Sequence, residues 1–200
     1  MFSPEIFVTV FGVIFIAELP DKTALATLVL ATRHRALPVF AGTALALIVQ
    51  SVIAVAAGGA LALLPSRPVH IAAGVLFLAS ALAMWRSKDE AASETQTEAE
   101  AESASSAVEP SFGSAFAKAF AIVFLAELGD LTQLGTAALA ARFRSPLSVF
   151  AGSALALCSV SALAVFLGNR LSRLINPRQV RRVAALVFGL LGLGFVTGLI

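Results

Sequence analysis

Charge is scarce in this 200-residue sequence. Only 13% of the residues are Asp, Glu, Lys or Arg, about half the share of soluble domains. By contrast, 58% are hydrophobic and the mean hydropathy is +0.92. Seven of the 12 acidic residues lie between residues 89 and 109, so the rest of the chain holds only five. This scarcity excludes a water-soluble globular domain and predicts an all-α integral membrane protein.

Cysteine and histidine are also rare. Cys158 is the only cysteine, which excludes an intramolecular disulfide and a thiolate metal cluster. Neither of the two histidines, His34 and His70, lies in the middle of an apolar stretch, so the ligands that zinc, copper and nickel usually recruit are missing. The net charge of +2 is spread between apolar runs. We therefore expect a membrane environment and no nucleic-acid partner.

Six apolar stretches are long enough to cross a bilayer, which takes about 20 residues. No Lys or Arg precedes Lys22, so we expect the first stretch to be a retained span rather than a secretory signal. Between the third and fourth stretches, a segment rich in Glu, Ser, Ala and Thr predicts a disordered or loosely helical linker. The predicted spans are 4–32, 38–64, 69–86, 114–141, 147–169 and 180–200, organised as a three-helix repeat (1–86), the linker (87–113) and a second three-helix repeat (114–200).

An internal duplication relates the two halves. Residues 15–33 and 124–142 share 11 identities in 19 positions, and residues 39–47 and 149–157 share eight in nine. The polar residues align as well, Glu18 with Glu127 and Asp21 with Asp130. Since each copy holds three spans, an odd number, the second copy enters the membrane from the opposite side. The sequence thus predicts two inverted repeats, an architecture of many secondary transporters.

The basic residues predict an orientation. On the side of the predicted linker the loops hold ten of the 14 Lys and Arg residues, and the opposite side holds three. The positive-inside rule then places the linker in the cytoplasm and both termini outside. We expect a multi-pass protein of the plasma (inner) membrane.

Four carboxylates interrupt the apolar spans: Glu18, Asp21, Glu127 and Asp130. An ionised side chain at the bilayer centre costs about 2.5–3.5 kcal/mol, so four unpaired ones would cost about 10 kcal/mol or more. Lys22 can neutralise only one of them. Because inverted repeats place their sites at the repeat interface, we expect the acids to form one oxygen-rich site for Mg²⁺, Ca²⁺ or Mn²⁺. Four carboxylates around one dication should titrate as a coupled set, so metal entry should expel protons.

The residue between the acids predicts a broken helix in each half. Within each pair the i, i+3 spacing places both carboxylates on one helical face. Pro20 lacks a backbone donor and Gly129 is flexible, so we expect both helices to break or kink there. Irregular backbone is tolerated at membrane depth where it lines a cavity. The expected supporting groups are the freed carbonyls, Thr23, Thr132 and Gln133, with Lys22 as a counter-charge.

The segments Glu-Leu-Pro-Asp-Lys-Thr from Glu18 and Glu-Leu-Gly-Asp-Leu-Thr-Gln from Glu127 resemble a known signature. It is the doubled Glu-x-Gly-Asp-(Lys/Arg)-(Ser/Thr) motif of a cation-transporter family of the Golgi, the chloroplast envelope and bacterial plasma membranes, related to the lysine-exporter superfamily. The resemblance covers the chain apart from the linker. It implies export of Mn²⁺, and in some members Ca²⁺, against protons, with the four motif acids as ligands.

Two departures from this signature make the two motifs unequal. Pro20 replaces the usual Gly of the first motif, and Leu131 replaces the usual basic residue of the second. In addition, Ala24 stands where the second motif has Gln133. Since all four acids are present, we expect a cation site that is less symmetric and more negative than the signature implies.

The predicted function is export of a divalent cation, Mn²⁺ before Ca²⁺, in exchange for protons, without enzymatic activity or a resident cofactor. One alternative is export of a cationic organic solute such as a basic amino acid. A remote alternative is a membrane metal-dependent enzyme, but no Ser/His or Cys/His pair accompanies the acids. Arg33 and Arg142 would also lie about 20 Å from the acids along a helix. Homo-oligomerisation is left open.

Overall fold

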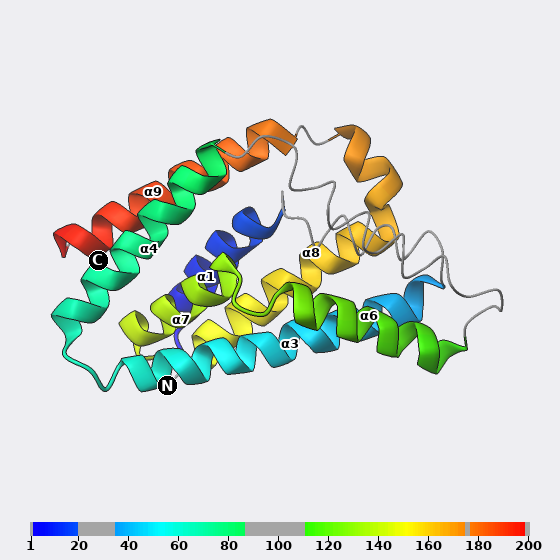
Figure 1. The fold of residues 1–200 in the computed structure, drawn as a ribbon, viewed down its shortest axis with the longest axis horizontal. Helices are drawn as coiled ribbons and strands as arrows, with labels where there is room; N and C mark the ends of the chain where they lie inside the picture. Colours follow the sequence, from blue (N-terminus) through cyan, green and yellow to red (C-terminus); the bar gives the residue numbers. More distant parts are fainter. Residues whose placement is uncertain (1, 20–34, 87–110, 175–176, 199–200) are drawn as a thin grey trace.

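The computed structural model describes residues 2–19, 35–86, 111–174 and 177–198, and everything regular in these ranges is α-helix (Figure 1). Four of the residues predicted for the site, Pro20, Asp21, Lys22 and Thr23, lie outside the described residues, as does most of the predicted linker. The helices are α1 (Pro4–Glu18), α3 (Ala36–Leu61), α4 (Ser66–Arg86), α6 (Phe112–Ala126), α7 (Leu131–Phe143), α8 (Pro146–Leu174) and α9 (Pro177–Thr197).

Long apolar helices dominate the described part of the chain. Three of them, α3, α4 and α8, are long and apolar enough to cross a membrane, and α6 with α7 would make a fourth crossing if the pair forms one bent span. The apolar part of α9, Arg182–Thr197, is shorter. The chain is therefore an all-helical membrane protein with three to four candidate spans among its described residues. The predicted span 114–141 is bent in the structure, because α6 and α7 meet at an angle of 71°.

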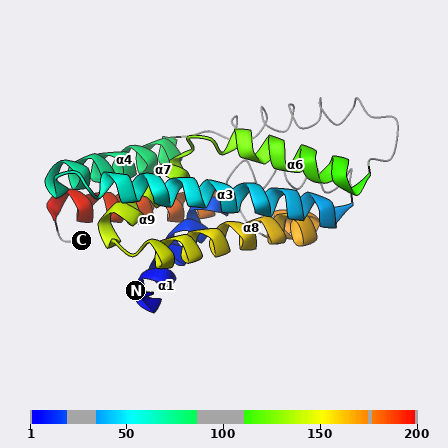
Figure 2. The same ribbon diagram turned by 90° about the horizontal axis from the view of Figure 1, so that it is seen from below.

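Helices α4 and α9 lie alongside each other at one end of the molecule in both views (Figures 1 and 2). Phe77 of α4 is almost completely buried between Phe188 and Phe195 of α9, with ring centroids 5.2 and 5.5 Å apart. Such aromatic pairs bury large apolar areas and hold the two helices in register. This pair closes one side of the core that α1, α7 and α8 also share.

The two similar halves pack crosswise, with the first helix of each half against a later helix of the other half. Helix α3 lies against α6, and α8 lies against α1. At Gly42 an added β-carbon would overlap the carbonyl oxygen of Phe116, and at Gly152 it would lie 2.8 Å from that of Phe7. These two contacts are equivalent in the duplication, since Gly152 follows Gly42 by 110 positions and Phe116 follows Phe7 by 109. Small residues thus allow both crossings to approach at backbone distance.

Gly42→Ala should test this close crossing. Its β-carbon has to displace backbone rather than a flexible side chain, so we expect a loss of about 1–3 kcal/mol in the free energy of unfolding. Gly59→Ala is the matched control, because Gly59 belongs to the same helix and has nothing within 4 Å of its added β-carbon. Thermal unfolding of the purified protein in detergent measures both. Equal unfolding temperatures for the two variants would refute the close crossing.

Candidate metal centre

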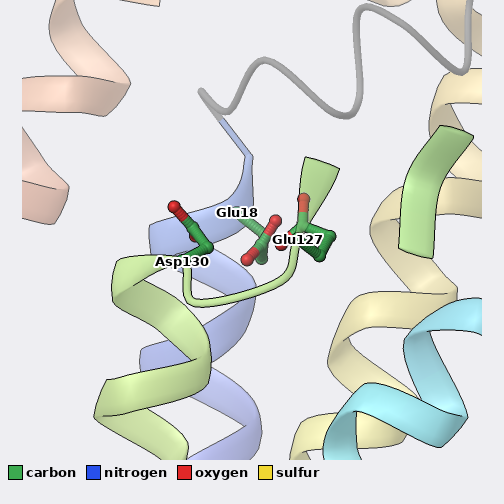
Figure 3. Close-up of side chains that lie close together, drawn as sticks. All are labelled: Glu18, Glu127 and Asp130. Atoms are coloured by element: carbon green, nitrogen blue, oxygen red, sulfur yellow. The ribbon is translucent and has the colours of Figure 1, made fainter. Parts of the chain in front are cut away.

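Three carboxylates from two distant segments meet in the structure. One oxygen each from Glu18, Glu127 and Asp130 lies within 4.8 Å of the others. Figure 3 shows Glu18 at the end of α1, facing the turn that carries the other two. Both glutamates are only 3% exposed, and Asp130 is half-buried. An enclosed acidic cluster therefore joins the two halves of the duplication.

The turn between α6 and α7 brings Glu127 and Asp130 together. Glu127 is the C-cap residue of α6 and Asp130 is the N-cap residue of α7. Gly129 between them has a φ of +82°, in the left-handed region that favours glycine. The predicted break at Gly129 is confirmed. The expectation that this pair shares one helical face is wrong, because the acids lie on the ends of two different helices.

Breaking the helix frees backbone groups that must find partners in an apolar setting. In a continuous helix the carbonyl of Phe124 would accept from the N–H of Leu128. Instead, Leu128 donates to the Leu125 carbonyl at 3.3 Å, and Nε2 of Gln50 donates to the Phe124 carbonyl at 2.8 Å. A side chain of α3 thus replaces the missing helical hydrogen bond.

A second amide satisfies the other side of the break. The N–H of Gly129 donates to Oε1 of Gln133 at 2.7 Å, and Nε2 of Gln133 donates to Oε1 of Gln50. Gln133 was predicted as a supporting group, and its described hydrogen bonds are with Gly129 of the turn and with Gln50 of α3. Gln50 was not predicted. The signal that could have found it is that it is the only amide among the 26 residues of α3.

Thr132 orients the Asp130 carboxylate. Both its backbone N–H, at 3.3 Å, and its hydroxyl, at 2.9 Å, donate to Oδ2 of Asp130. This is an N-cap arrangement, in which the carboxylate also lies at the positive end of the α7 dipole. The hydroxyl of Thr136 donates to the carbonyl of Thr132 one turn later, at 2.9 Å. Thr132 was predicted to supply a ligand oxygen. In the structure its hydroxyl and its N–H hold the Asp130 carboxylate in place.

Helix α3 holds both sides of the bend, and it runs beside α6 and α7 in both views (Figures 1 and 2). Gly42 contacts α6, Gln50 contacts the break, and an added β-carbon at Gly58 would overlap the carbonyl oxygen of Ala137 in α7. The close backbone contacts at Gly42 and Gly58, together with the hydrogen bonds of Gln50, thus hold the 71° bend between α6 and α7 from one neighbouring helix.

A cavity of about 10 Å³ lies beside Glu127, one of the three acids, and it has roughly the room that one water molecule needs. Its polar lining includes Glu127, Gln50, Thr132, Gln133 and Thr136. Carboxylate, amide and hydroxyl oxygens are ligands for hard cations. The chemistry that this arrangement supports is the binding of one small cation, or of protons in its place.

The comparison with protein families bears on this arrangement. The sequence model of a family described as "Divalent cation/proton antiporter GDT1" matches residues 6–92 and 115–198. These two segments contain Glu18 in one and Glu127 with Asp130 in the other. The chain belongs to the GDT1 family. That family is one of transporters, not of enzymes.

The chain is also similar to individual proteins, two of which are named as GDT1-like. The chain is 33% identical over 200 residues to "Protein PAM71, chloroplastic" of Arabidopsis thaliana, covering 91% of this chain and 54% of that protein. It is 31% identical over 201 residues to "GDT1-like protein 1, chloroplastic" of Oryza sativa subsp. indica, covering 91% and 59%, and 31% identical over 203 residues to "GDT1-like protein 3" of the same subspecies, covering 93% and 72%. It spans between half and three fifths of the first two relatives. No solved structure matches.

Gly129→Ala should show that the turn depends on a left-handed residue. An L side chain at this φ costs about 1–2 kcal/mol, although nothing lies within 4 Å of the added β-carbon. The expected result is a loss of about that size in the free energy of unfolding, with a smaller loss for Gly129→Asn. Gly113→Ala is the control, since its surroundings are equally open but its φ is not positive. If Gly129→Ala and Gly113→Ala unfold at the same temperature in detergent, the turn does not have this requirement.

Proposed function

We propose that this GDT1-family chain exchanges a divalent cation for protons at the site formed by Glu18, Glu127 and Asp130, with Asp21 as the fourth ligand. The observation that carries the proposal is the convergence of three acids from both halves of the duplication within 4.8 Å. The activity named for the family is the same exchange. Divalent cations and protons are then the two substrates of one site.

Repulsion between the carboxylates couples the two substrates. Two ionised carboxylates about 4.8 Å apart repel by about 3 kcal/mol at an effective dielectric constant of 20, so three cannot stay ionised together without compensation. A dication between the oxygens removes the repulsion, and so does protonation. Because either one replaces the other, binding of metal releases protons and binding of protons releases metal. This competition is the thermodynamic basis of antiport.

The ligand chemistry favours Mn²⁺, with Ca²⁺ as the second substrate. The described groups around the site offer oxygen atoms only, from carboxylates, amides and hydroxyls. Oxygen ligands suit Mn²⁺, Ca²⁺ and Mg²⁺ rather than zinc or copper. The cavity of about 10 Å³ is much smaller than the several hundred Å³ of a typical organic ligand pocket, so it favours an ion over a basic amino acid.

For the architecture we propose six spans in two inverted three-helix repeats, residues 1–86 and 114–200, joined by the linker 87–113. The crosswise packing of α1 with α8 and of α3 with α6 supports it, since an exchange of the two halves maps one pair onto the other. The bent pair α6 and α7 fits the broken helices that form sites at the midplane of inverted-repeat transporters.

For the orientation we propose a cytoplasmic linker and outward-facing termini in the plasma (inner) membrane of the cell. The excess of Lys and Arg on the side of the linker supports it. Two relatives are named as chloroplastic proteins. With this orientation and an inward proton gradient, the exchange would export the metal from the cytoplasm.

Flux measurements in sealed proteoliposomes under an imposed pH gradient test the function, with Mn²⁺, Ca²⁺ and Mg²⁺ compared. For Glu18→Gln and Glu127→Gln we expect proton-driven Mn²⁺ flux to fall roughly tenfold or more, because even outer-shell partners of a metal cost 10–100-fold when removed. Glu5→Gln is the matched control, since Glu5 is an exposed acid on the same helix as Glu18. Wild-type flux in both site variants, or equal loss in Glu5→Gln, would contradict the assignment.

A further inference from the structure

A second and larger cavity, of about 340 Å³, lies at the far end of α7 from the acids. Asp130 is the N-cap residue of α7 and Arg142 lies in the last turn of this helix, so roughly 18 Å of helix separate the two sites. The walls come from the end of α3, the start of α4 and the end of α7. This cavity therefore joins the two halves of the chain at a place the acidic site does not reach.

Positive charge dominates the polar part of this cavity. Arg142, Arg144 and His70 line it, and no acidic residue is among its described lining. The Nε atom of Arg142 is buried and has no hydrogen-bond partner among the described residues. A buried guanidinium donor without an acceptor is costly, so the described residues leave the Arg142 guanidinium incompletely compensated at this atom.

A local backbone feature places both arginines in the same cavity. Residues at i and i+2 of a helix point to opposite sides, so a continuous helix would separate Arg142 from Arg144. Arg144 ends α7 with a φ of 49°, the one positive φ of a non-glycine residue among those described. Leaving the helix at this residue brings its side chain to the cavity that Arg142 also lines.

We propose that this cavity binds a phosphate-type oxyanion. Guanidinium groups present planar, paired donors that match phosphate oxygens, and their charge strengthens each hydrogen bond. The volume falls in the range of small-ligand sites. The remaining walls include apolar side chains such as Leu61, Leu64 and Val69, which suit either the ester part of a phospholipid headgroup or a partly dehydrated inorganic phosphate.

Binding measurements on the purified full chain in neutral detergent test this proposal. Inorganic phosphate is titrated by calorimetry, and phosphatidylglycerol is compared with phosphatidylcholine by native mass spectrometry. For Arg142→Gln and Arg144→Gln we expect binding to weaken about tenfold or more, the effect of losing a charged hydrogen bond. Arg67→Gln is the matched control, because Arg67 is an exposed arginine at the start of α4 that does not line the cavity.

The pattern of results decides both the site and the source of its ligand. Saturable phosphate binding without lipid identifies the free ion, whereas binding of phosphatidylglycerol alone identifies a lipid headgroup, and either result supports the proposal. Arg142→Lys keeps the charge but loses the paired donors, so it should bind more weakly than wild type while unfolding at the same temperature. No binding by the wild type, or equal weakening in Arg67→Gln, would overturn the proposal.

Discussion

Repulsion among carboxylates held together in an apolar protein is the constraint on which the rest of this structure depends. Glu18 comes from one half of the duplication and Glu127 with Asp130 from the other, so the cluster exists only when the halves are packed together. Burial strengthens the repulsion because the low dielectric screens it poorly. The fold must therefore hold the acids in place while leaving their charge to be balanced by exchangeable cations or protons.

The residues that support this cluster differ between the two halves of the duplication. The N–H of Gly129 needs an acceptor, and Gln133 with Gln50 provides the chain of amides that satisfies the break. In the duplication Gly129 corresponds to Pro20, Gln133 to Ala24 and Gln50 to Val160. Proline has no N–H to satisfy, and the carbonyl of Phe15, which corresponds to Phe124, accepts from the N–H of Leu19 at 3.1 Å. The first motif therefore lacks the two unsatisfied backbone groups that Gln133 and Gln50 serve in the second motif, and the three residue differences are explained together.

Much of the site could be predicted from sequence because charge in an apolar span is costly wherever it occurs. That cost singled out Glu18, Glu127 and Asp130, and the glycine between the last two predicted the break. The positions of the acids on two helix ends could not be predicted, since they depend on the φ of Gly129. Gln50 was missed because its role depends on which carbonyl the break frees. The cavity at Arg142 was missed because it needs two loops distant in sequence to meet.

The most direct test of the central claim is the number of Mn²⁺ ions bound per chain, measured by electron paramagnetic resonance titration of the purified protein. A single site shared between the halves predicts one ion per chain, lost in Glu18→Gln and also lost in Glu127→Gln. Two independent half-sites would bind two ions, and each variant would lose only one. That second result would contradict the account, because the acids would then act separately despite their proximity.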